Sequence, residues 1–168
     1  MLRKLPFLLT LISVIGGIAI SIGFGINEDY FKDRIKQGLE KNVKVQAITD
    51  EAKKAETIKT ETDKNWRYYL RYHFHAGAIA ALTLALLMFL NFLETSPREY
   101  LTVSYMLALG GWLYPFVWLF AALYGPEMGR NEAKESFRFL GYMGGVYLLG
   151  LIYTLFLASA RKWKAPLA

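Results

Sequence analysis

A chain of 168 residues with a positive mean hydropathy, 54% hydrophobic residues and 20% charged residues is long enough for one domain. It has no cysteine, which excludes disulfides, thiolate chemistry, Cys-ligated zinc and iron–sulfur clusters. The net charge of +6 is weak evidence for nucleic-acid binding, and none is expected, because much of that charge lies at the two chain ends. Of the 34 Asp, Glu, Lys and Arg side chains, 19 lie in residues 28–67, between long uncharged blocks. Such separation predicts a single membrane domain over residues 1–168.

The first predicted span covers residues 5–26, an uncharged run of the length that a bilayer core needs. A cleavable signal peptide is the alternative, but its apolar region would be shorter and would end in an Ala-x-Ala-like site. We therefore expect a retained helix. Gly17, Ser21 and Gly25 form a stripe of small residues on it, which would allow another helix backbone to approach closely.

Residues 27–65 form a polar segment of mixed charge, which we expect to be largely helical and extramembrane. Apolar residues recur at helical spacing in two stretches. They are Phe31, Ile35 and Leu39 in the first stretch, and Ile48, Ala52 and Ala55 in the second. The alternating sequence around Val43 and Val45 suggests a break between them. We predict two amphipathic helical pieces near the membrane surface, acting either as a solvated hairpin or as a binding arm.

The second predicted span covers residues 68–93 and opens with a belt of aromatic residues typical of a membrane interface. The belt consists of Trp66, Tyr68, Tyr69 and Tyr72. Arg67 and Arg71 lie one turn apart and can reach lipid headgroups or a partner, so they are candidate interface residues. A polar turn at 94–99, in which Pro97 bars helix continuation, makes the second and third spans antiparallel neighbours.

The third predicted span covers residues 100–124 and should be kinked at Pro115. A loop at 125–135 follows, and its charged residues, including Glu127, Glu132 and Arg130, are interpreted as solvated. The fourth span covers residues 137–160, where Gly141 and Gly145 give a second small-residue face. The predicted fold is an all-α integral membrane protein with four transmembrane helices in an antiparallel bundle.

Four spans place both chain ends on one side of the membrane. The basic ends favour the cytoplasm, whereas the Lys and Arg count of the long first loop opposes it. We expect an inner (plasma) membrane protein with cytoplasmic termini.

The two histidines, His73 and His75, are the only side chains of the usual haem-ligand or transition-metal-ligand kind. On a helix, residues two apart point about 200° away from each other, so no shared metal site is expected. Either ring can act alone, as a ligand or proton carrier, or as an interfacial anchor bonded to a carbonyl or water. Gly77 and Ala81 leave room for a flat macrocycle beside His73, which makes His73 the preferred ligand.

The sequence Arg71-Tyr-His73-Phe-His75-Ala-Gly77 resembles the start of the second helix in haem-copper oxidase and nitric oxide reductase catalytic subunits. It also resembles small membrane proteins related only to the first helices of that superfamily. The resemblance implies that a histidine here is an axial haem ligand on the outer side. The family needs further histidines on later helices, and this chain has none after His75. A complete oxidase is therefore excluded, and a second haem ligand would come from another subunit or from a residue such as Met106 or Met143.

Other catalytic patterns are missing: the sequence has no P-loop, GxSxG, HExxH or Gly-rich dinucleotide turn. No charge lies at the centre of a span, which disfavours a pump or a proton-coupled transporter. The leading hypothesis is an accessory or structural subunit of a larger membrane complex, such as a respiratory complex, with the bilayer and other membrane subunits as partners. Catalytic activity of the chain on its own is not expected. The alternative is a haem-binding electron-transfer or quinone-site subunit that uses His73 or His75.

Overall fold

The computed structural model describes residues 3–164, and its regular elements are all helical. In chain order they are α1 (Leu5–Lys41), α2 (Val43–Gln46), α3 (Glu51–Phe89), a 3-10 turn (Leu90–Phe92), α4 (Pro97–Leu113), α5 (Phe116–Met128), α6 (Arg130–Ser136) and α7 (Arg138–Ala160). Within the described residues, four helical stretches are long and apolar enough to cross a membrane. They are Leu5–Lys41, Glu51–Phe92, Pro97–Met128 and Arg138–Ala160, so the predicted number of long apolar helices is confirmed.

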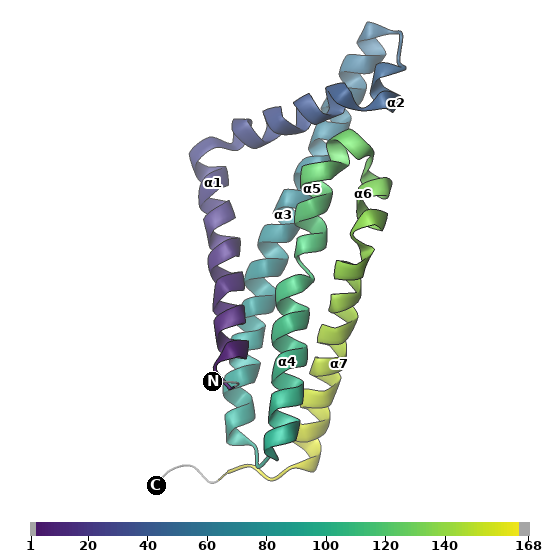
Figure 1. The fold of residues 1–168 in the computed structure, drawn as a ribbon. Coiled ribbons are helices and arrows are strands. Elements are labelled where there is room, and N and C mark those ends of the chain that lie inside the picture. The colour runs from purple at the N-terminus through teal and green to yellow at the C-terminus, as the bar shows by residue number, and fades with distance from the viewer. Residues whose placement is uncertain (1–2, 165–168) are drawn as a thin grey trace.

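The chain runs up along α1, down along α3, up along α4 and α5, and down along α7 (Figure 1). The start of α1, the connection between α3 and α4, and the end of α7 lie at one end of the molecule. The second half of α1, α2, and the junction between α5 and α6 lie at the opposite end. We call this opposite end the arm end.

Helix α1 bends sharply at Asn27, where φ is −156° and ψ is 81°. The Asn27 side-chain oxygen accepts a hydrogen bond of 2.9 Å from the backbone N–H of Tyr30, as an N-cap does, so a new helical segment starts after the bend. This segment, residues 28–41, is called the arm, and it lies across the arm end of the other helices (Figure 1). Ile35 and Leu39, two arm residues of the predicted apolar stripe, are buried.

Aromatic rings fill the inside of the α1 bend. The ring of Phe24 lies 4.8 Å from that of Trp66 and 5.0 Å from that of Phe31, measured between centroids. Phe31 in turn lies 5.4 Å from Tyr69 in an edge-to-face arrangement. Such pairs stabilise beyond the area they bury, so part of the predicted aromatic belt packs inside the protein and holds the bend.

The second predicted amphipathic piece is not separate from the second span. Asp50 caps a new helix by accepting hydrogen bonds from the N–H groups of Ala52 and Lys53, and the helix then continues unbroken to Phe89. The predicted stripe of Ile48, Ala52 and Ala55 is wrong, because the two alanines are exposed. The buried positions are polar, Thr62 and Asn65, and each side chain donates a hydrogen bond to the carbonyl four residues earlier. The predicted break around Val43 holds a single helical turn, α2.

Pro115 breaks the third span as predicted: α4 ends at Leu113 and α5 begins at Phe116. The loop predicted at 125–135 is wrong. Helix α5 continues to Met128, Gly129 reverses the chain with a φ of 102°, and α6 follows at once. Only a glycine adopts this positive φ without strain, which explains a turn of one residue where the sequence suggested a longer loop.

Close contact between helices depends on glycines. A Cβ atom added to Gly110 of α4 would lie 2.6 Å from the backbone nitrogen of Tyr147 in α7, and one added to Gly17 of α1 would lie 3.1 Å from the nitrogen of Gly77 in α3. Three glycines of the predicted small-residue stripes are not at a helix contact, since nothing lies within 4 Å of a Cβ built on them. They are Gly25, Gly141 and Gly145.

The α4–α7 contact gives a stability prediction. Gly110→Ala places a methyl group against the Tyr147 backbone, which cannot move cheaply, and should lower the free energy of unfolding by about 1–3 kcal/mol. Thermal unfolding in detergent micelles, followed by circular dichroism, measures the loss. Gly145→Ala is the matched control and should lose nothing, because its Cβ meets open space. Equal effects of the two substitutions would contradict the close approach.

Candidate functional site

The two histidines of α3 are turned toward different helices. The Nδ1 atom of His73 lies 2.9 Å from the carbonyl oxygen of Gly17 in α1. The Nδ1 atom of His75 lies 2.7 Å from the carbonyl oxygen of Arg71 in its own helix, and its ring packs 5.4 Å from that of Tyr114. No group of three His, Asp or Glu side chains in residues 3–164 is arranged to hold a metal ion. The two rings therefore act separately, each bonded to a backbone carbonyl.

The predicted interface arginines lie near the middle of α3. The Arg71 guanidinium lies 4.8 Å above the ring of Trp118 and 5.6 Å above that of Tyr68, both within cation–π distance. Arg71 thereby links α3 to α5. Arg67 is exposed, as is Gly25 on α1, while Ser21 is half-buried.

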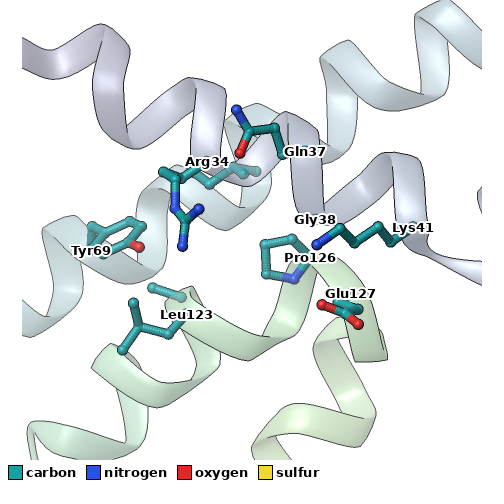
Figure 2. A pocket seen from close by; sticks show the side chains of 10 residues that line it. Arg34, Gln37, Gly38, Lys41, Tyr69, Leu123, Pro126 and Glu127 are labelled. Atoms are coloured by element: carbon teal, nitrogen blue, oxygen red, sulfur yellow. The ribbon is translucent and has the colours of Figure 1, made fainter.

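A pocket of about 110 Å³ lies between the arm and α5 (Figure 2). The arm lines it with Arg34, Gln37 and Lys41, and α3 lines it with the ring of Tyr69. Helix α5 lines the opposite side. Its α5 residues are Ala122, Leu123, Pro126 and Glu127. The arm approaches closely because residue 38 is a glycine: a Cβ there would lie 2.7 Å from the Cβ of Pro126. The sequence analysis did not identify this pocket.

A network of polar side chains, which we call the polar cap, joins the arm, α2, α3 and α6 beside this pocket. It consists of Asn42, Lys44, Glu61, Lys64, Asn65, Arg130 and Glu132. Asn42 is buried, and its amide donates hydrogen bonds to the carbonyls of Pro126 at 3.1 Å and Glu127 at 2.9 Å. Its side-chain oxygen accepts from the N–H of Lys44. One side chain therefore caps both the end of α5 and the start of α2.

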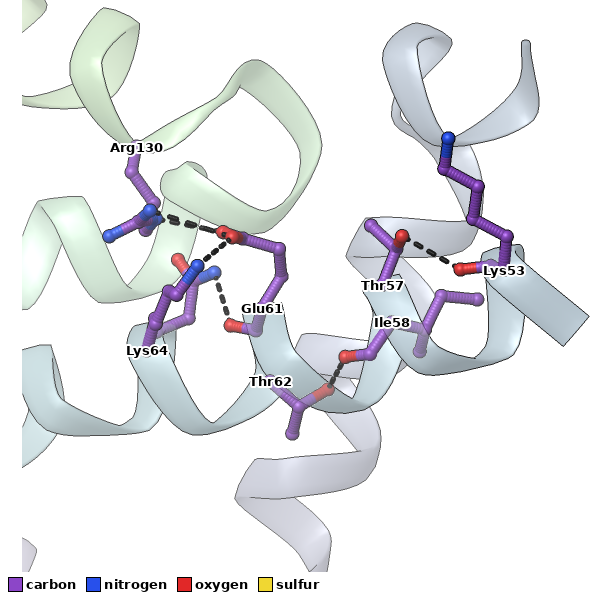
Figure 3. Close-up of polar contacts among 8 residues, drawn as sticks. Lys53, Thr57, Ile58, Glu61, Thr62, Lys64 and Arg130 are labelled. Carbon is purple, nitrogen blue, oxygen red and sulfur yellow. Dashed lines mark hydrogen bonds and ion pairs between the residues drawn. The ribbon is translucent and has the colours of Figure 1, made fainter. Parts of the chain in front are cut away.

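Ion pairs tie α6 to the rest of the cap. Glu61 of α3 lies 2.8 Å from the Arg130 guanidinium and 2.9 Å from the Lys64 ammonium (Figure 3). Lys44 lies 2.6 Å from Glu132, and its hydrogen bond holds the pKa of that carboxyl below its usual range. The pair therefore persists until the pH falls through this lowered pKa. Arg130 and Glu132 therefore each form an ion pair with another helix, Arg130 with α3 and Glu132 with α2. The sequence had indicated a solvated loop at these positions.

Asn65 is fully buried beneath the cap. Its amide donates 2.8 Å to the Glu61 carbonyl, but its side-chain oxygen has no hydrogen-bond partner among the described residues. That oxygen lies next to Gly125, where an added Cβ would be 2.9 Å away. A neighbouring cavity of about 290 Å³ is lined by charges of both signs, Lys44 and Arg130 against Glu61 and Glu132. The two cations and two carboxylates that line this cavity balance one another, so the cavity has no excess charge for a charged ligand.

Parts of the cap carry a local sequence signal. Glu61 and Lys64 have the spacing of a helical ion pair, and Asn42 stands beside the predicted break. The pair of Glu61 with Arg130 joins positions 69 residues apart, which no local pattern reveals.

Comparisons of the chain with protein-family models, with curated proteins and with solved structures find no match.

The double role of Asn42 gives a second stability prediction. Asn42→Ala removes the hydrogen bonds to two α5 carbonyls and the cap of α2, so unfolding should become easier by about 1–3 kcal/mol. Hydrogen exchange of the α2 and α6 amides should also accelerate, and mass spectrometry measures it. Asn131→Ala, at an exposed position of α6, is the control and should leave both properties unchanged. Unaltered exchange in Asn42→Ala would contradict the capping role.

Proposed function

We propose that the chain is an accessory subunit of a larger membrane assembly, inserted as an antiparallel bundle of four helices. The apolar outer surface supports insertion, since only 22% to 44% of the residues in the apolar 18-residue window of each candidate span are buried within the protein. The remaining apolar side chains face outward, where lipid or other membrane helices can cover them. The basic residues flanking the first and last spans support cytoplasmic termini in an inner (plasma) membrane, with the polar cap on the outer side.

The observation that carries this proposal is the outer face of α7. Gly141 and Gly145 lie one turn apart with open space around them, and exposed Phe139, Tyr142 and Leu148 flank them. A glycine pair of this kind contributes nothing to packing within the chain. In a bilayer, small residues four apart allow a second helix to approach closely. Helix α7 therefore has a surface suited to a transmembrane helix of another subunit.

The α7 surface can be tested in native membranes. Gly141→Leu combined with Gly145→Leu fills the surface without touching the interior, so the chain should fold yet be lost from the assembly. Native electrophoresis in mild detergent measures the mass of the complex that contains the chain. Ala78→Leu with Ala81→Leu adds similar bulk to an exposed face of α3 and is the control. An assembly that keeps the α7 variant, or a wild-type chain that migrates alone, would refute the proposal.

A second candidate function is haem binding for electron transfer or at a quinone site. The supporting observation is that each histidine is bonded to a carbonyl through Nδ1. A histidine that donates Nδ1–H to a carbonyl presents its Nε2 lone pair as a ligand, an arrangement common at metal sites. His73 and His75 are turned toward different helices, so each haem would need its other axial ligand from elsewhere.

An absorption spectrum of the purified protein separates the two functions. Haem ligation predicts a Soret band that disappears in His73→Ala and survives in His75→Ala, because His73 is the preferred ligand. If the Soret band disappears only in His75→Ala, then His75 is the haem ligand and the haem lies on the α4–α5 side of α3. A folded, colourless protein purified from haem-replete cells would eliminate this candidate and leave the accessory function.

A further inference from the structure

We propose that the pocket under the arm binds the phosphate group of an anionic phospholipid. The proposal concerns a lipid site on α1, α3 and α5, separate from the α7 surface. It therefore stands whether or not another subunit docks on α7.

The cations of the arm differ in whether they are paired with a carboxylate. Lys32 and Lys36 form ion pairs with Glu28 and Asp33 of the arm itself. Among the described residues, Arg34 and Lys41 have no carboxylate at ion-pair distance. These two unpaired cations are the ones that line the pocket.

The pocket is lined by several hydrogen-bond donors. Arg34 and Lys41 lie two helical turns apart on one face of the arm, with Gln37 between them (Figure 2). The Arg34 guanidinium and the Tyr69 hydroxyl both face the space above Leu123. A guanidinium fork matches two phosphate oxygens, while an ammonium, an amide and a hydroxyl can each donate to the others.

Glu127 is the one acidic side chain lining the pocket. It opposes an anion, but two cations against one carboxylate leave an excess of one positive charge. The pocket therefore favours a singly charged anion such as a phosphodiester. By the same reasoning, removing the carboxylate should strengthen binding.

The position of the pocket favours a lipid as the source of the phosphate. The pocket lies where α1 leaves its apolar first segment and turns across the helix ends, which in the proposed orientation is the level of the lipid headgroups. The pocket is lined in part by the apolar residues Ala122 and Leu123, and Leu123, which is 50% exposed, is also part of the apolar outer surface. A lipid can place its phosphate in the pocket while its acyl chains follow this surface. Free phosphate would gain nothing from that surface.

Native mass spectrometry of the purified protein in detergent measures bound phosphatidylglycerol. Phosphatidylcholine is the net-neutral comparison, because its choline cation offsets the charge of its phosphate. Arg34→Gln with Lys41→Gln should reduce phosphatidylglycerol binding about tenfold, as expected for the loss of charge-assisted hydrogen bonds. Lys32→Gln with Lys36→Gln makes the same charge change on the same arm and should leave binding unchanged. Glu127→Gln should increase it.

Several results would overturn the proposal. Equal binding of both lipids would show that the pocket does not select for a net negative charge. Equal loss in both double variants would indicate only general attraction to the basic arm. Complete displacement of phosphatidylglycerol by inorganic phosphate would assign the pocket to a free anion. Arg34 and Lys41 are exposed, so their replacement leaves the packing intact. Unchanged circular dichroism checks this, and the Glu127→Gln variant gives an independent result of opposite sign.

Discussion

The constraint on which the rest of the structure depends is its large apolar outer surface. Ile15 of α1 is 64% exposed and Leu155 of α7 is 71% exposed, and both belong to long apolar helices. Exposing such a surface to water costs about 25 cal/mol for each Å², and soluble monomers rarely carry apolar patches of this extent. A bilayer removes this cost, and it also requires charged side chains to lie outside its hydrocarbon core. The proposed insertion therefore explains why the polar side chains collect in the arm and the polar cap.

In a lipid environment apolar burial does not drive helices together, so close packing must do so. The approach of α4 to α7 at Gly110, and of α1 to α3 at Gly17, provides this packing. The hydrogen bond from His73 to the Gly17 carbonyl adds a polar contact at the second of these crossings. Gly141 and Gly145 are equally small, but nothing lies within 4 Å of a Cβ built on either, so they do not contribute to this packing. They are instead available to a helix of another subunit in the proposed assembly.

The sequence predicts what depends on local composition, and it fails where distant segments meet. Uncharged runs locate the spans, and Pro115 locates the helix break, because both effects act within a few residues. The arm's return over α5 depends on Gly38 meeting Pro126, and the cap depends on Glu61 meeting Arg130, contacts that join distant positions. Glycine spacing alone could not separate the packed Gly17 from the open Gly25. For the candidate site, spacing indicates that the two histidines diverge, but it does not reveal the pocket under the arm.

In the proposed topology, four spans place the arm end and the chain ends on opposite sides of a bilayer. Because the chain has no cysteine, single cysteines can be introduced and labelled in sealed vesicles with a membrane-impermeant thiol reagent. Lys53→Cys and Asn131→Cys mark the arm end, and Glu94→Cys and Lys162→Cys mark the opposite end. The account predicts that one pair is labelled at once and the other only after the vesicles are permeabilised. Labelling of all four positions in sealed vesicles, or a split within either pair, would contradict it.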